Sequence, residues 1–277
     1  MNKTLRAFTA ALAAALCTAG AAGAMTIGTF NIEYFSVYGD RRYVPSDLEA
    51  LASSIRKSGA DVLALQEIEG AATMRFFVTH WLRGWNYAGN DTDSTQDLFF
   101  LWNENKVSME GSPKVFYANQ SCAFEGRKFR LFDRPPLSAR FRDKKNGRIY
   151  TLTAVHLKSN FTGNSRDKEA ARRYNEAKRR AQIEKLNQLA ENAEGPTFIL
   201  GDYNDPNPQR EVNYPLLGLE RGTSFDSWGS NLDYIGFVNI SRTALGPVKE
   251  TETRIRRRST KKKEHPDHDI ITVEILE

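Results

Sequence analysis

The chain repeats one pattern, in which a short apolar run adjoins a polar residue that could hold a metal ion or move a proton. The pattern occurs at 27–31, 62–67, 152–156, 197–204, 232–235 and 267–271. Short apolar runs bounded by Gly, Asp or Asn are typical of buried strands, and open α/β sheets bind ligands at the ends of their strands. A single case could be an ordinary turn, because Asp, Asn and Pro favour turns. Six cases are hard to explain by packing, so we predict that these polar residues converge on one site.

The segments between these strands have their own signals. Helical spacing of apolar residues predicts helices at 45–58, 74–82 and 166–192. A strand at 97–102 is expected to open a hairpin into Val107, and 144–147 is expected to be the turn before the strand that ends at His156. Strands and helices alternate early, whereas hairpins dominate later. This mixture favours a mixed-sheet α/β sandwich over a purely parallel, doubly wound sheet.

The first 24 residues have the three parts of a secretory signal peptide. Lys3 and Arg6 precede an apolar run that is too short to span a bilayer, and small residues follow it up to Ala24. We therefore expect an exported protein, periplasmic or secreted, whose mature chain covers 25–277 as one domain. Loss of the leader leaves Cys122 as the only cysteine, so no intramolecular disulfide is available.

The formal net charge of +5 is less informative than its distribution. The stretch 254–263 contains seven basic residues and no acidic one, just before Asp267 and His268. Such a stretch could contact the phosphates of a nucleic acid, or could be a solvated hairpin tip. We predict a nucleic-acid-binding loop whose basic residues are Arg254, Arg256, Arg257, Arg258, Lys261, Lys262 and Lys263.

The residue types in the predicted site suit hydrolysis of a phosphodiester. Glu67 and Asp202, with the amides Asn31 and Asn204, supply the oxygen ligands that Mg²⁺ prefers. Zinc fits less well, because the mature chain has one cysteine and its histidines lack a close ligand spacing. The acid and base are expected among His156 and His268, which titrate in the useful range. Asp233 or Asp267 could orient such a histidine.

These residues lie in motifs that resemble those of the endonuclease/exonuclease/phosphatase superfamily, and its deoxyribonuclease I-like members in particular. The motifs are Phe-Asn-Ile-Glu at 30–33, Leu-Gln-Glu-Ile at 65–68, Val-His-Leu-Lys-Ser at 155–159, Gly-Asp-Tyr-Asn at 201–204, Leu-Asp-Tyr-Ile at 232–235 and Asp-His at 267–268. Segments at 98–101, 105–108 and 134–136 also match. The resemblance covers the whole mature chain, with the motifs in the family's order.

The resemblance implies a four-layered α/β sandwich with two facing mixed sheets flanked by helices, and Mg²⁺-dependent cleavage of phosphodiester bonds, with Mn²⁺ or Ca²⁺ as alternative ions. Glu67 and Asn31 match metal-binding residues. His268, oriented by Asp233, matches the histidine that we expect to activate water, and His156 its partner at the leaving oxygen. The remaining matches hold metal or the scissile phosphate, namely Asp202, Asn204, Asp267 and Arg134.

Two departures from the family pattern stand out. After His268 the chain has Asp269-Ile270, whereas the family has one variable residue and then a proline. Gln96 or Asp97 occupies the position where the family has a glutamate that supports the histidine matched by His156. Gln96 could orient His156 but would not stabilise its cation. The alternatives are a phosphoesterase acting on a lipid or a small phosphorylated molecule, and a non-catalytic nucleic-acid-binding effector. We expect a monomer with a nucleic-acid substrate, DNA favoured, and no stable membrane association.

Overall fold

The computed structural model describes residues 25–40, 42–225, 229–253, 255 and 266–276, and the predicted leader lies outside them. The strands are β1 Met25–Phe35, β2 Val62–Ile68, β3 Trp85–Gly89, β4 Asp97–Asn103, β5 Val107–Val115, β6 Ser121–Phe124, β7 Arg127–Arg130, β8 Leu137–Asp143, β9 Ile149–His156, β10 Thr197–Asp202, β11 Leu216–Leu217, β12 Asp233–Val238, β13 Lys249–Thr251 and β14 Ile270–Ile275. The α-helices are α1 Pro45–Lys57, α2 Gly70–Trp81 and α3 Lys168–Glu191. None of the described helices is long and apolar enough to cross a bilayer.

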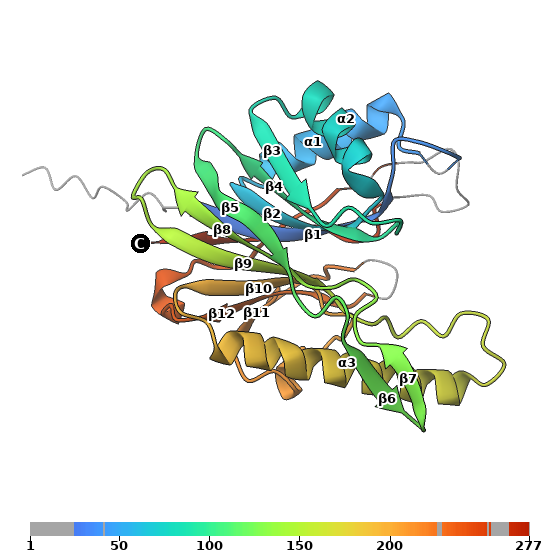
Figure 1. The fold of residues 1–277 in the computed structure, drawn as a ribbon. Helices are drawn as coiled ribbons and strands as arrows, with labels where there is room; N and C mark the ends of the chain where they lie inside the picture. Colours follow the sequence, from blue (N-terminus) through green and yellow to red (C-terminus); the bar gives the residue numbers. More distant parts are fainter. Residues whose placement is uncertain (1–24, 41, 226–228, 254, 256–265, 277) are drawn as a thin grey trace, which may run out of the picture.

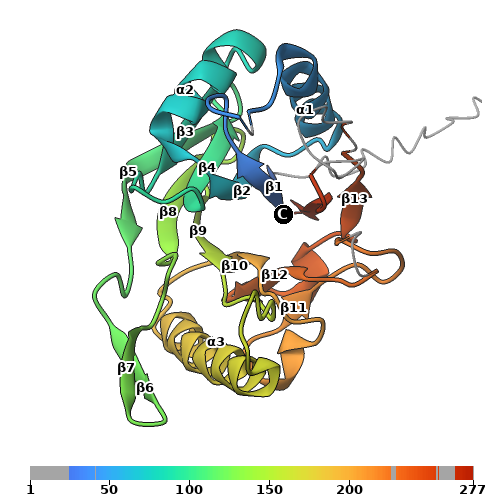
Figure 2. The same ribbon diagram turned by 90° about the vertical axis from the view of Figure 1, so that its right-hand side faces the viewer.

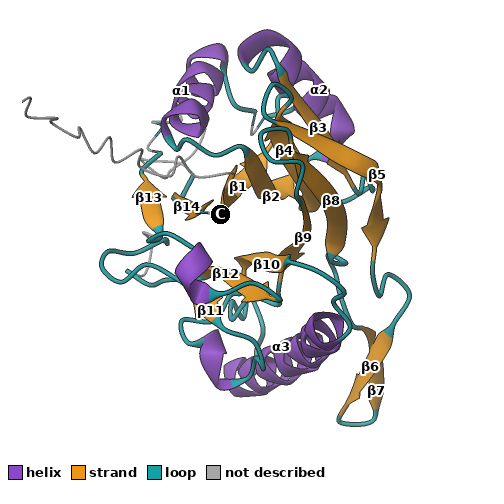
Figure 3. Ribbon diagram, turned by 90° about the vertical axis from the view of Figure 1, so that its left-hand side faces the viewer, coloured by secondary structure: helices purple, strands orange, loops and turns teal. Residues whose placement is uncertain are grey.

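The elements form four layers (Figures 1 and 3). One sheet has the strand order β13-β14-β1-β2-β4-β3, and the facing sheet has the order β11-β12-β10-β9-β8-β5. Helices α1 and α2 cover the outer face of the first sheet, and α3 covers the outer face of the second. This arrangement confirms the predicted sandwich of two facing mixed sheets.

Three apolar clusters fill the spaces between the layers. The central cluster joins both sheets and includes Phe100 and Phe141, whose ring centroids are 5.3 Å apart. The second lies between the first sheet and helices α1 and α2, and the third between the second sheet and α3. Burial of apolar surface on both faces of each sheet is the main stabilising contribution that this architecture offers.

The strand directions explain why polar residues gather at one edge. Strands β1 and β2 are parallel, and so are β9 and β10, in which Asp202 lies opposite His156. Strand β12 is antiparallel to β10, so its first residue, Asp233, also lies opposite Asp202. Strand β14 is antiparallel to β1, so the residues that precede it reach the same edge. A tight approach between β9 and β10 needs glycine at 201, where a Cβ would lie 1.9 Å from the carbonyl oxygen of Val155.

The structure confirms some predicted elements and corrects others. Helix α3 and the turn between β8 and β9 lie where the sequence predicted them. The expected hairpin between 97–102 and Val107 is wrong, because β4 pairs within the first sheet whereas β5 pairs with β8 in the second. The stretch 116–130, for which no element was predicted, contains the separate two-stranded hairpin of β6 and β7.

Candidate active site

Six elements bring the predicted polar residues together at the end of the sandwich that faces the viewer in Figure 2. The contributing side chains are Asn31 from β1, Glu67 from β2, His156 from β9, Asp202 from β10, Asp233 from β12, and His268 from the segment before β14. All are buried except Glu67, whose side chain is 12% exposed. Buried carboxylates and imidazoles are rare unless they are paired, so their concentration here indicates a functional site.

The Oδ2 atom of Asp202 is at the centre of this group. It lies 3.2 Å from Asn31 Nδ2, 3.4 Å from His156 Nε2 and 3.8 Å from His268 Nε2. The other oxygen, Oδ1, accepts a 2.7 Å bond from the backbone N–H of Asn204. Burial raises the pKa of the Asp202 carboxyl to about 7; His268 opposes the rise, while Asp233 adds to it. Asp202 therefore titrates where a general base is effective.

His268 and Asp233 form a buried pair. Nδ1 of His268 lies 2.8 Å from Oδ2 of Asp233, and the ring of Phe225 packs against the imidazole at 4.7 Å. Burial alone lowers the pKa of His268, but the carboxylates of Asp233, Asp202 and Asp267 raise it to about 10. The imidazole thus holds its proton at neutral pH. In this form His268 can donate a proton, whereas the role of base that the sequence suggested would need its neutral form.

His156 has a different environment. Its Nε2 lies 3.4 Å from Asp202 and 3.8 Å from Oε1 of Glu67, whereas its Nδ1 is buried without a hydrogen-bond partner in the described part of the chain. Burial, and then the positive charge of Arg134, lowers the pKa of His156 well below its usual value. The ring is therefore neutral at pH 7. Gln96, which could have oriented His156, accepts a bond from Arg134, and no bond joins it to His156 in the described part of the chain.

Arg134 joins the site from the segment before β8. Its guanidinium donates to Gln96 Oε1 at 2.8 Å and to the backbone carbonyls of Leu157 at 2.8 Å and His156 at 3.3 Å. A guanidinium has five N–H donors, so three bonds leave two for a substrate. Arg134 is thus fixed in place and still able to contact a phosphate.

Glu67 and Asn31 are the residues best suited to hold a divalent cation. Glu67 has a left-handed backbone, with φ 61°, and its Oε2 accepts a bond from the N–H of Tyr34. Glu67 and Asp202 both approach Asn31 Nδ2, at 3.3 and 3.2 Å, so negative charge is concentrated there. Strained backbone is typical of functional residues, and Mg²⁺ commonly binds one or two carboxylates together with water.

The rest of the predicted metal set is not assembled in the same way. Among the described residues, no group of three or more His, Cys, Asp or Glu side chains is arranged to hold a metal ion. Asp267 contributes negative charge beside His268, and its assignment as a metal ligand stays a prediction.

Asn204 also has a left-handed backbone, with φ 52°. Its Nδ2 donates to the carbonyl of Leu157 at 3.1 Å, and its own carbonyl accepts a bond from Asn160 Nδ2 at 3.3 Å. Asn160 was not among the predicted site residues. Neither was Lys158, a half-buried residue whose pKa is lowered by burial and whose neighbours include Arg134. Both belong to the loop after β9, where apolar periodicity gives no signal.

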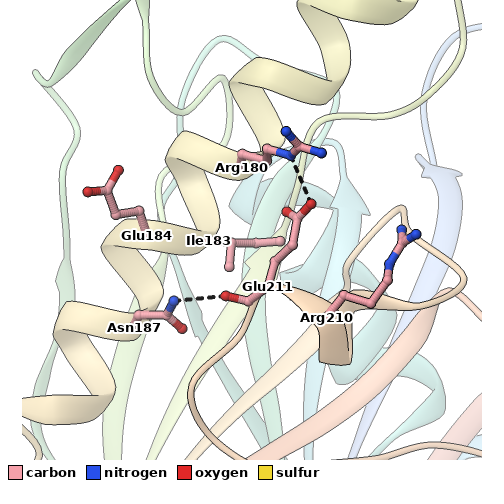
Figure 4. Close-up of a pocket in the computed structure, with 6 residues that line it drawn as sticks. All are labelled: Arg180, Ile183, Glu184, Asn187, Arg210 and Glu211. Carbon is pink, nitrogen blue, oxygen red and sulfur yellow. Dashed lines mark hydrogen bonds and ion pairs between the residues drawn. The ribbon is translucent and has the colours of Figure 1, made fainter.

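Two other features add no described residue to this group. The predicted basic loop lies outside the described residues, since Arg254, Arg256, Arg257, Arg258, Lys261, Lys262 and Lys263 are not among them. Figure 4 shows side chains of α3 facing Arg210 and Glu211 across a hollow. The hollow has a volume of about 520 Å³. Some of its polar groups are already paired, since Glu211 accepts bonds from Arg180 and Asn187. None of the predicted site residues lines it.

Comparison with known proteins identifies relatives of the whole sandwich. The profile of the Endonuclease/Exonuclease/phosphatase family matches residues 28–248. No curated protein sequence matches significantly. The structure of D. rerio TDP2 with a single-strand DNA product is 15% identical, with 90% of this chain and 98% of that chain covered and a TM-score of 0.60. The human nocturnin catalytic domain with bound sulfate is 15% identical, with 90% and 93% covered and a TM-score of 0.57.

A third similar structure is that of a phosphatase. The mannosyl-6-phosphatase of Bacteroides thetaiotaomicron is 15% identical, with 91% of this chain and 99% of that chain covered and a TM-score of 0.58. At such low identity these likenesses show a shared fold. They do not distinguish among a nuclease, a phosphatase and a related phosphoesterase.

Proposed function

Because the chain belongs to the endonuclease/exonuclease/phosphatase family, whose members hydrolyse phosphoester bonds, we propose that it is an exported phosphodiesterase that cleaves nucleic acid, with DNA as the favoured substrate. The observation that carries this proposal is the position of Asp202 Oδ2 within 3.8 Å of three nitrogens, from Asn31, His156 and His268. A carboxylate, a protonated imidazole and a neutral imidazole meet at one point. Together they offer the base and the donors that phosphodiester hydrolysis needs.

In the proposed mechanism, Asp202 accepts the proton of the attacking water, because its raised pKa makes it a stronger base than an exposed carboxylate. His268, held as a cation by Asp233, gives its proton to the leaving oxygen as the bond between that oxygen and phosphorus breaks. The free donors of Arg134 bind a non-bridging phosphate oxygen. His156 stays neutral and positions the water or the leaving oxygen through Nε2.

A divalent cation fits the oxygen atoms of Glu67, with Asn31 beside it. Mg²⁺ is the ion we favour, and when bound it would supply a positive charge next to the phosphate. The other groups of the chain keep the roles given above. Burial of Asp202 and His268 keeps bulk solvent away from the pair and strengthens their electrostatic effect.

The hairpin of β6 and β7 favours nucleic acid over a membrane lipid. A lipid-binding hairpin should expose apolar side chains at its tip, but here the tip is Glu125-Gly126-Arg127. The hairpin's aromatic residue Phe129 instead packs on Tyr174 of α3, with ring centroids 4.6 Å apart. One observation favours a lipid substrate as the second candidate: Phe161, in the loop after His156, is 69% exposed.

The direct test compares substrates that differ in ester type. We expect hydrolysis of bis-4-nitrophenyl phosphate, a diester, to exceed that of 4-nitrophenyl phosphate, a monoester, by at least about tenfold in kcat/KM, since each tenfold corresponds to about 1.4 kcal/mol of transition-state stabilisation. Excess chelator should abolish the diester reaction. A preference for the monoester would indicate a phosphatase. Faster cleavage of sphingomyelin vesicles than of DNA would indicate the lipid enzyme.

A further inference from the structure

Two hollows connect the active site with the β6–β7 hairpin. The first, of about 610 Å³, is lined by Arg134 at the active site and by Arg130 on β7. The second, of about 400 Å³, is lined by Arg130 and Lys128. Ala118, Asn119 and Arg130 line both hollows, which therefore adjoin. We call this path from Arg134 past Arg130 to Lys128 the hairpin groove.

Strand alternation explains why two cations face this groove. Successive side chains of a strand point to opposite faces, so Lys128 and Arg130 share one face of β7 and Phe129 occupies the other. Phe129 packs against Tyr174 of α3 at 4.6 Å, which fixes the orientation of the hairpin. The partners of Arg130 and Lys128 across the hairpin are the small residues Ser121 and Ala123. The groove face is therefore open around both basic side chains.

The charges of the hairpin groove are available to a ligand. Lys128 and Arg130 are exposed, and neither makes an ion pair or hydrogen bond with another described residue. Two of the three exposed arginines of α3 differ, since Arg173 pairs with Glu169 and Arg180 pairs with Glu176 and Glu211, whereas Arg172 makes no ion pair with a described residue. Unpaired basic side chains along a path that leads from a phosphoesterase site are suited to a chain of phosphates.

Three acidic residues, Asp93, Asp97 and Asp133, also line the groove. Asp97 accepts bonds from the N–H and hydroxyl of Thr92, and Asp133 forms a 2.7 Å ion pair with the buried Lys178. Those two carboxylates are already engaged, whereas Asp93 is exposed and offsets part of the positive charge. Lys128 and Arg130 lie two residues apart on a strand, which places their Cα atoms about 7 Å apart. This spacing lets them contact different phosphates of one strand.

We propose that the hairpin groove binds the polynucleotide strand beyond the scissile phosphate, with Arg130 and Lys128 as phosphate contacts outside the catalytic group. The inference rests on the proposed nuclease function and deepens it, because it assigns the enzyme a polymeric substrate of several nucleotides. A dinucleotide has a single phosphodiester, so once that phosphate is in the active site none is left for Arg130 or Lys128. Arg127, which pairs with Phe124 on the face toward α3, has the same charge but does not face the groove.

The test compares Lys128→Gln/Arg130→Gln with the matched control Arg127→Gln. Activity of each protein is measured as kcat/KM on a single-stranded 20-mer and on a thymidine dinucleotide, at several salt concentrations. Two lost phosphate contacts should lower kcat/KM on the 20-mer by roughly tenfold relative to the dinucleotide, and should flatten the salt dependence by about 1.4 log units per log unit of salt. Thermal unfolding of all variants should stay near that of the wild type, because the three side chains are exposed.

The outcomes separate this inference from the proposed function. A selective loss on the 20-mer in the double variant, absent in Arg127→Gln, supports the groove. An equal loss in Arg127→Gln, or no loss in the double variant while the wild type cleaves the 20-mer, overturns the groove and leaves the nuclease function standing. A wild-type protein that hydrolyses bis-4-nitrophenyl phosphate but neither oligonucleotide overturns both. If the double variant unfolds, Lys128→Arg/Arg130→Lys, which keeps both charges, must restore stability and activity on the 20-mer together.

Discussion

Asp202→Asn should lower kcat on a nucleic-acid substrate by about 10³-fold, because the variant loses the proposed general base. The same change should raise the stability of the protein at pH 8. In the folded chain the pKa of Asp202 is about 7 rather than its usual value of 3.8, so folding favours the protonated form. That contribution is present at low pH and is lost as the pH rises through 7, where the buried carboxylate becomes unfavourable.

The measurement is thermal unfolding in chelator at pH 5 and pH 8. We expect the Tm of Asp202→Asn to exceed that of the wild type by about 3 °C or more at pH 8, and by less at pH 5. Asp143→Asn is the matched control, because Asp143 is a buried acid near the opposite end of β9. It should leave kcat unchanged. A variant at 202 that is active and less stable at pH 8 would contradict the assignment of Asp202 as a strained base.

His268→Gln should lower kcat by about 10² to 10³-fold, the usual cost of removing one donor to a developing negative charge. Glutamine can still donate to Asp233, so the buried carboxylate need not be left without a partner. Asp233→Asn tests the charge itself. It should let the pKa of His268 fall from about 10, so the loss of activity should be greater at pH 8, where less imidazolium remains, than at pH 6.

The alternative role for His268 predicts the opposite pH dependence. If His268 were the base, it would act in its neutral form, and Asp233→Asn would be more damaging at pH 6 than at pH 8. His80→Gln is the control, since His80 is exposed on α2 and bonds only to the carbonyl of Phe76. That substitution should leave the pH profile of kcat unchanged.

The sequence predicted most of the fold and the membership of the site because both depend on local patterns. Apolar runs beside Asn31, Glu67, His156 and Asp202 end at one edge because their strands form two parallel pairs. Asp233 reaches that edge from the beginning of an antiparallel strand, so convergence there depends on strand direction as well as on sequence. Strand direction is a property of the whole sheet and has no local signal.

Residue roles and long-range pairings were less predictable for physical reasons. The proton on His268 depends on carboxylates distant in sequence, such as Asp233, which lies 35 residues away. The register and sheet of β5 depend on β8. From composition alone, the charged residues of α3 would be expected to face solvent. In the structure Lys178 is buried and pairs with Asp133, and Arg179 is buried and pairs with Asp205. Burial of a charge depends on tertiary partners that helical periodicity does not reveal.

The most direct test of the central claim is incubation of supercoiled plasmid with the mature protein in Mg²⁺, in excess chelator, and with Glu67→Gln in place of the wild type. We expect the wild type to nick and then degrade the plasmid in Mg²⁺, and to leave it intact in excess chelator. Glu67→Gln should cleave at least about 10²-fold more slowly, because it keeps the shape of the side chain but loses the charge proposed to bind the cation. An intact plasmid after incubation with the wild type in Mg²⁺, or equal cleavage in all three reactions, would contradict the proposed metal-dependent nuclease function.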